Sequence, residues 1–179
     1  IAQFEDQKVL VVKRFDRRIE EDMIFRLPQE DMCQALGQVS GSKYEENGGP
    51  GSQKIMKLLS GSKNAYEDRL EFMRVQIVFW LLAAIDGHAK NFSVVLNQDG
   101  YRLTPFYDVL SAYPYFGQGN IQAKKVKMAM KVHSKNTHYK WNDIMPRHWP
   151  EHGRKQGVDE AQTLGILASL DEKAEEALT

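Results

Sequence analysis

The sequence has few of the features that mark secreted, membrane-spanning or nucleic-acid-coating proteins. Among its 179 residues there is one cysteine, Cys33, so no internal disulfide can form and a reducing compartment such as the cytoplasm is expected. No uninterrupted apolar run approaches the roughly 20 residues that span a bilayer, so we expect no membrane partner. The formal net charge is zero, and therefore no overall field points to nucleic acid.

Two phosphate-binding patterns are missing as well. The sequence contains neither Gly-x-Gly-x-x-Gly nor Gly-x-x-x-x-Gly-Lys-Ser/Thr, the loops whose backbone amides hold nucleotide phosphates. The glycines at 48–51 end a stretch rich in Gly, Ser and Asn, residues 37–51, which predicts a loop. The chain opens on Ile1, which is neither an initiator methionine nor the start of a signal peptide, and we read this opening as that of a fragment.

What is present fits one globular domain. With 42% hydrophobic and 27% charged residues, a chain of this length can bury a single core. Apolar residues recur at helical spacing over 64–85, and in the second half of this segment almost every face of the expected helix is apolar. This pattern predicts a long buried helix. Further helices are predicted over 27–36, 52–59, 126–132, 141–145 and 160–178, and a strand over 8–15.

A β-hairpin is predicted directly after the long helix. Strands over 92–96 and 101–104 flank Asn97-Gln98-Asp99-Gly100, whose residues are typical of a tight turn. Because helices are predicted for most of the other segments, the expected fold is mainly α with one small β-hairpin.

The residues that could take part in catalysis or bind a metal lie in and around this helix end and hairpin. Asp86 and Asn91 are five positions apart, and Asp108 follows the return strand. A tight hairpin returns the chain to its start, so we expect Asp108 near Asn91. One Asp and one Asn, with substrate phosphates, suffice to hold Mg²⁺, while the other Asp can orient a hydroxyl and accept its proton. Protein kinases place Asp-x-x-x-x-Asn, a strand pair and a metal-binding Asp in this order.

The spacing also has a simpler explanation. Asp86 and Gly87 can form a helix-ending turn, and Asp108 can cap a following element without any catalytic role. Asp-x-x-x-x-Asn occurs by chance in many proteins, so the spacing does not decide between the two readings.

The flanking sequence favours the first reading, because several blocks resemble the HipA family of bacterial toxin kinases. The blocks, in the family's order, are 12–17, 26–34, 43–45, 86–93 and 103–108. The resemblance covers about residues 9–145 and fades towards the C-terminus. It implies the larger, C-terminal lobe of a protein-kinase-like fold with the N-terminal lobe absent. Residues 1–18 would then be the hinge strand and its exit, and residues 19–179 a helical lobe with its catalytic loop at 86–91.

The resemblance also implies roles for individual positions. Asp86 matches the catalytic base, and Asn91 and Asp108 match the metal ligands. Positions that contact the nucleotide correspond to Lys13, Arg14, Phe15, His88, Lys90, Asn91, Tyr107 and Asp108. The implied cofactors are ATP and Mg²⁺, and the implied substrate is a serine or threonine of a protein. The implied partner is a HipB-like helix-turn-helix antitoxin, through which the complex reaches DNA.

Lys13 can be read in two ways. Val11-Val12-Lys13 is similar to the strand that carries the phosphate-binding lysine of ordinary protein kinases, but the Arg-Phe-Asp-Arg after it fits the hinge, whose backbone binds adenine. Lys13 stands where the family carries Glu, a difference that backbone recognition tolerates. Because half of the cleft would be missing, we expect the chain alone to be inactive and to bind ATP weakly.

Weaker signals leave other functions open. Arg154 and Lys155 lie near the DNA-contacting part of the family, but the sequence departs from the family there, and a solvated basic face is the simpler reading. A small-molecule or lipid kinase could carry a similar Asp-x-x-x-x-Asn loop. A non-catalytic module binding an antitoxin or DNA is the third possibility, although such a module has no need of Asp86, Asn91 and Asp108 together.

Overall fold

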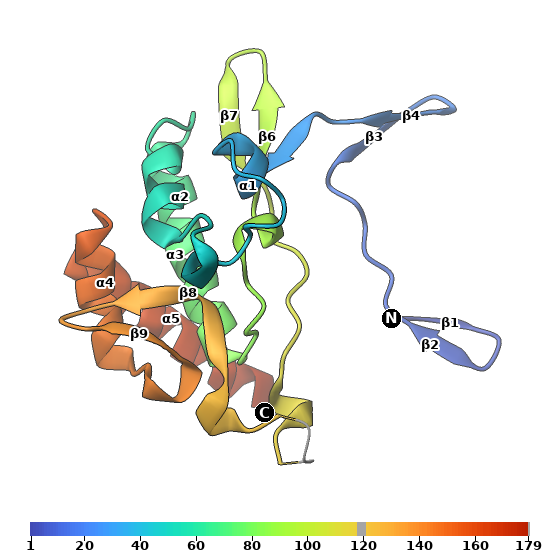
Figure 1. The fold of residues 1–179 in the computed structure, drawn as a ribbon. Helices are drawn as coiled ribbons and strands as arrows, with labels where there is room; N and C mark the ends of the chain where they lie inside the picture. The colour runs from blue at the N-terminus through green and yellow to red at the C-terminus, as the bar shows by residue number, and fades with distance from the viewer. Residues whose placement is uncertain (118–120, 179) are drawn as a thin grey trace.

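The protein is a mixed α and β structure. The computed structural model describes residues 1–117 and 121–178, and within these ranges it contains five α-helices and nine β-strands (Figure 1). The strands form four small antiparallel sheets, one of three strands and three of two. The prediction of a mainly α fold with one hairpin is therefore wrong. None of the helices in the described ranges combines the length and apolarity needed to cross a membrane.

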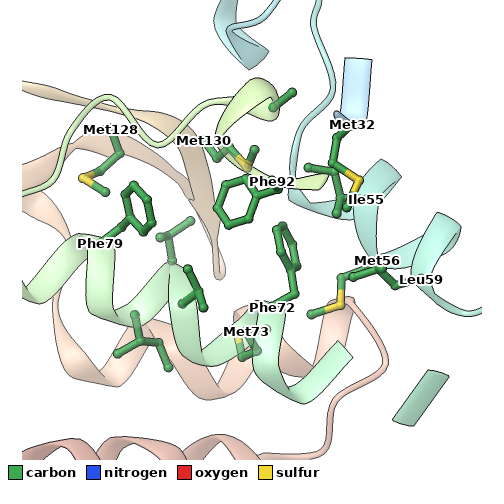
Figure 2. Packing of buried hydrophobic residues seen from close by; sticks show 14 of the residues in the cluster. Met32, Ile55, Met56, Leu59, Phe72, Met73, Phe79, Phe92, Met128 and Met130 are labelled. Atoms are coloured by element: carbon green, nitrogen blue, oxygen red, sulfur yellow. The ribbon is translucent and has the colours of Figure 1, made fainter. Parts of the chain in front are cut away.

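The central element is helix α3, Ala65–Leu81, within the helix predicted over 64–85. It is shorter than predicted because Ala83 adopts a left-handed backbone, with φ of 47°, and so turns the chain out of the helix. Phe72 packs edge-on against Phe92 with ring centroids 4.9 Å apart, and Phe79 lies below Met128 and Met130 (Figure 2). This core fixes the end of α3 beneath the start of the next strand.

Two other helices match their predicted bounds, and two short helices complete the set of α-helices in the described residues. Helix α2 spans Ser52–Leu59 and helix α5 spans Glu160–Leu178. Helix α1 spans Met32–Ala35, and helix α4 spans Trp149–Lys155. The helix predicted over 141–145 is replaced by 3-10 turns at Trp141–Asp143 and Pro146–His148.

The helix predicted over 126–132 is a strand. Strand β8, Lys127–His133, pairs with β9, Thr137–Lys140. Met128, Met130 and Val132 are buried on one face of the strand, and Ala129 is buried as well, so the alternation typical of a strand is only partial. The two-stranded sheet covers the C-terminal half of the core.

The three-stranded sheet brings distant segments to one place. Strands β6, Ser93–Asn97, and β7, Gly100–Leu103, form the predicted hairpin, and Asn97 faces Gly100 across the turn. On the other side of β6 lies strand β5, Gln29–Asp31, so the predicted start of a helix over 27–31 is wrong and the helix begins only at Met32. Helix α1 follows β5 directly, so residues 29–35 lie beside the segment that connects α3 to the hairpin.

Two N-terminal hairpins extend away from this body (Figure 1). The first pairs β1, Ala2–Phe4, with β2, Gln7–Val9, and the second pairs β3, Arg17–Glu20, with β4, Met23–Arg26. The strand predicted over 8–15 is wrong in its extent, because β2 ends at Val9 and residues 10–14 have no regular structure. The predicted domain boundary at residue 18 falls inside β3 and stays a prediction.

Candidate functional site

Asp86, Asn91 and Asp108 come together where α3 ends and the β6–β7 hairpin begins. Asp86 lies in the turn after α3, Asn91 ends a 3-10 turn, and Asp108 follows β7. Asn91 Nδ2 donates a hydrogen bond to Asp108 Oδ2 at 2.8 Å, and Asp86 lines the same small pocket as Asp108. The convergence expected from the hairpin is therefore present, while the catalytic and metal-binding roles stay predictions.

The backbone fixes the two expected metal ligands in different ways. Asn91 is 2% exposed, and its Oδ1 accepts the backbone N–H of His88 at 3.1 Å, which holds the amide in the loop. Asp108 is exposed and adopts a left-handed backbone with φ of 59°, a conformation that Asp tolerates better than most residues. An amide oxygen keeps a second lone pair when it accepts one hydrogen bond.

This pair has the donor chemistry that Mg²⁺ requires. Among residues 1–117 and 121–178, no group of three or more His, Cys, Asp and Glu side chains could hold a metal by itself. Mg²⁺ is commonly bound by one or two protein oxygens, with waters and substrate phosphates filling its other positions. Asn91 and Asp108 thus fit a magnesium ion that arrives with a nucleotide, and they do not fit a permanent all-protein metal cage.

His88 is a buried side chain next to Asp86. Its burial lowers the pKa of the imidazole, and its Nε2 lies 3.9 Å from Asp86 Oδ2. Its Nδ1 is buried without a hydrogen-bond partner in the part of the chain that the structure describes. An unpaired ring nitrogen at the edge of the site is compatible with the predicted nucleotide contact.

Lys90 is anchored by a residue that the sequence did not single out. Its Nζ lies 2.8 Å from Asp31 Oδ2, and this hydrogen bond raises the pKa of the Lys90 ammonium. The other oxygen of Asp31 accepts the backbone N–H groups of Cys33 and Gln34 at 2.9 and 3.0 Å and so caps α1. One carboxylate therefore joins α1 to the predicted catalytic loop.

Tyr107 connects this loop to the predicted hinge. Its hydroxyl donates to the backbone carbonyl of Lys90 at 2.9 Å and lies 2.5 Å from Ser93 Oγ. Burial raises the pKa of the phenol. On its other side the ring lies 6.0 Å from that of Phe15. Phe15 is thus brought to the site, whereas Arg14 is engaged by Asp16 at 2.7 Å and Lys13 is exposed.

Tyr44 is the second site residue that the sequence did not predict. Its hydroxyl donates to Asp86 Oδ1 at 2.6 Å across 42 positions of sequence, and its ring meets His88 edge-on at 5.2 Å. The only available signal was its place in the family-like block at 43–45, which carries no indication of a role.

The two predicted DNA-contacting residues lie apart from this group, at the end of α4. Arg154 and Lys155 are 3.8 and 3.6 Å from the carboxylate of Glu151. Lys155 also donates to the backbone carbonyl of Ser134. Both cations are therefore partly engaged within the fold, and the DNA contact stays a prediction.

Comparison with known sequences indicates one family. The family model described as HipA-like C-terminal domain matches residues 1–178. A Sinorhizobium fredii protein named as a candidate kinase, Y4mE, is 36% identical over 69% of this chain. The serine/threonine-protein kinase toxin HipA of Shewanella oneidensis is 30% identical over 64% of the chain. The aligned parts are only 28% and 30% of those two relatives.

A solved structure supports the fold. A chain in the complex of the Shewanella oneidensis MR-1 toxin–antitoxin system HipA, HipB and its operator DNA superposes with a TM-score of 0.74. The superposition covers 87% of this chain and 37% of that chain, at 22% sequence identity. At this identity the likeness concerns the fold alone.

Proposed function

Since this chain belongs to the family of HipA-like C-terminal domains, we propose that it carries the catalytic residues of an ATP- and Mg²⁺-dependent serine/threonine protein kinase. The observation that carries the proposal is that Asp108 accepts a hydrogen bond from Asn91 and lines one small pocket together with Asp86. A helix-ending turn and a capping residue would not need to converge, so the geometry favours the kinase reading over the simpler one.

Each residue has a chemical task in this proposal. Asp86, whose side chain is 63% exposed, orients the hydroxyl of the acceptor serine or threonine and takes its proton. Asn91 and Asp108 would hold Mg²⁺, which when bound neutralises charge on the phosphates. Positioned charge of this kind supplies most of the rate in phosphoryl transfer.

The nucleotide would lie along the residues between the predicted hinge and the catalytic loop. Phe15 and Tyr107 offer aromatic surface, and Lys90 offers a positive charge that Asp31 holds in place. His88 presents a buried ring, the pKa of which is lowered by its burial, beside Asp86. Together these contacts support ATP as the phosphate donor.

We extend the proposal to the biological role. One relative is named a serine/threonine-protein kinase toxin, and the superposed solved structure is a complex of HipA, HipB and operator DNA. We therefore assign to the complete protein the part of a toxin that phosphorylates a protein and is restrained by a HipB-like helix-turn-helix antitoxin. DNA is then reached through the antitoxin.

The proposal predicts that two single substitutions abolish phosphate transfer. In the complete gene product, Asp86→Ala and Asp108→Asn should each lower transfer from γ-phosphate-labelled ATP to protein, by on the order of 10²- to 10⁴-fold for the base. Asn is chosen at 108 because it tolerates the left-handed backbone. The readout is label on the enzyme itself or on added casein.

The matched control is Asp99→Asn, which removes an exposed carboxylate at the hairpin tip that pairs with Lys63 at 3.2 Å. It should leave the transfer rate unchanged. Full activity in Asp86→Ala or Asp108→Asn would contradict the assignment, and label appearing only on a small molecule would point to a metabolite or lipid kinase.

A further inference from the structure

The hydrogen bond between Tyr44 and Asp86 restrains an exposed side chain whose other near neighbour, His88, lies 3.9 Å away. Asp86 is exposed at 63% of its side chain, and an exposed carboxylate normally rotates among several orientations. The Tyr44 hydroxyl holds its Oδ1 at 2.6 Å. Hydrogen bonds to an ionised acceptor are roughly twice as strong as neutral ones, so this contact can select one orientation.

Tyr44 is itself held by a closed loop, residues 43–51, which we call the Tyr44 loop. The backbone carbonyl of Tyr44 accepts the N–H groups of Asn47 and Gly49 at 3.1 and 3.0 Å. A Cβ at Gly49 would lie 2.2 Å from the carbonyl oxygen of Ser42 and 2.8 Å from that of Tyr44. Only glycine therefore allows the loop to close tightly on Tyr44.

The loop is anchored on two sides. Towards the catalytic segment, the carbonyl of Lys43 accepts the backbone N–H of Ala89 at 3.3 Å. Towards β8, the carboxylate of Glu45 accepts the backbone N–H of Lys131 at 2.8 Å and lies 3.2 Å from its Nζ. A Cβ at Gly51 would lie 1.9 Å from that carboxylate, so the chain packs directly against Glu45. These contacts fix Tyr44 relative to Asp86.

The ring and the hydroxyl of Tyr44 are both suited to this task. The ring meets His88 edge-on at 5.2 Å, and Lys43 Nζ lies 5.1 Å above it. The bond to Asp86 raises the pKa of the Tyr44 phenol to about 12, so the hydroxyl keeps its proton and stays a donor at neutral pH.

We propose that Tyr44 is a positioning residue that holds Oδ1 of Asp86, so that Oδ2 is left to accept the proton of the acceptor hydroxyl. This inference rests on the proposed function. In that step the acceptor oxygen bonds to the γ-phosphorus, the bond from the γ-phosphorus to the oxygen of ADP breaks, and the hydroxyl proton passes to Asp86. Tyr44 touches neither substrate nor metal and acts through Asp86 alone.

The test is Tyr44→Phe in the complete gene product, which keeps the ring and removes the hydroxyl. We expect kcat for phosphate transfer from labelled ATP to fall about tenfold, with KM for ATP within about twofold of wild type, since only the transition state is affected. The control is Tyr101→Phe, which removes a hydroxyl bond of the same 2.6 Å length, to the carbonyl of Leu58. Its kcat should not change.

Testing Tyr44→Phe in a second variant, one that lacks the Asp86 carboxylate, separates the positioning of Asp86 from a general effect on the structure. In Asp86→Asn, measured by its residual rate, adding Tyr44→Phe should lower kcat by less than about twofold, because the group that Tyr44 positions is no longer a base. An equal fall in both backgrounds, or an unchanged kcat in Tyr44→Phe alone, would overturn the inference. If Asp86→Ala is fully active, it is the proposed function that fails; if Asp86→Ala is inactive and Tyr44→Phe is normal, only the positioning role fails.

Discussion

At the scale of single residues, polar side chains that belong to other segments hold the predicted catalytic loop. Asp31 caps α1 with one oxygen and binds Lys90 with the other, and Tyr44 binds Asp86. Both contacts span long stretches of sequence. Local pattern therefore singles out the candidate residues, such as Asp86, but not the residues that hold them in place, because those contacts depend on which segments the fold brings together.

The two contacts of Asp31, the cap of α1 and the ion pair with Lys90, can be tested separately by substitution. Asn is as good a helix cap as Asp but cannot form the ion pair. Both Asp31→Asn and Asp31→Ala should lower the free energy of unfolding, and the loss should be about 1 kcal/mol smaller for Asn. Both substitutions release Lys90, so both should raise KM for ATP by a similar factor if Lys90 contacts the nucleotide.

Urea denaturation measures the free energy of unfolding of the two Asp31 variants, and initial rates at varied ATP concentration measure their KM for ATP. Equal destabilisation by Asn and Ala would show that capping of the four-residue helix α1 contributes nothing measurable.

At the scale of elements, a helix or strand was predicted correctly where its own residues determine its structure. The helices at Ser52–Leu59 and Glu160–Leu178 were predicted because their apolar spacing and end signals are local. Strand β8 was mistaken for a helix because its Met, Ala and Lys are good helix formers, although Met128 and Met130 already alternate. Strand β5 was missed because its partner, β6, lies far along the chain.

The contact between α4 and β8 predicts a dependence of stability on pH. His152 of α4 is fully buried, and its Nδ1 accepts the backbone N–H of His133 at 2.9 Å, which requires an unprotonated nitrogen. Burial lowers the pKa of His152 to about 3. The unfolded chain, with an ordinary histidine pKa near 6.5, therefore binds the extra proton first as pH falls.

The contribution of neutral His152 to the free energy of unfolding is thus complete above about pH 6.5. It decreases as pH falls towards 3, by up to roughly 1.4 kcal/mol per pH unit. Chemical denaturation between pH 7 and pH 5 should show this loss in the wild type and a smaller loss in His152→Asn, whose Oδ1 can replace Nδ1 as acceptor. Equal slopes in the two proteins would contradict the assignment of a neutral buried His152.

At the scale of the whole molecule, the described chain presents one side of the predicted nucleotide site. Leu10, Val11 and Val12 are 78, 61 and 70% exposed, and the N-terminal hairpins extend from the body (Figure 1). The aligned parts amount to 28 and 30% of the two relatives described above. The family could be predicted from blocks such as residues 86–93 and 103–108, whereas the mixed α and β fold and the course of the N-terminal segments could not.

We accordingly predict that residues 1–179 expressed alone bind ATP weakly or not at all. Only Phe15 of the predicted hinge contacts the site, through Tyr107, and Lys13 and Arg14 are exposed. Too few contacts then remain to order the nucleotide. Titration calorimetry would measure this affinity, and micromolar binding would refute the prediction.

The left-handed backbone of Asp108 bears on how such a protein can change in evolution. Only Gly, Asn and Asp adopt this conformation readily, and of these only Asp carries a negative charge. A single base change in the codon converts Asp to Asn or Gly, either of which suits the backbone. If Asp108 holds the metal as proposed, a gene lineage can lose phosphate transfer at this position while its product still folds. Inactive descendants that kept only their binding partners would then be expected to carry Asn or Gly there.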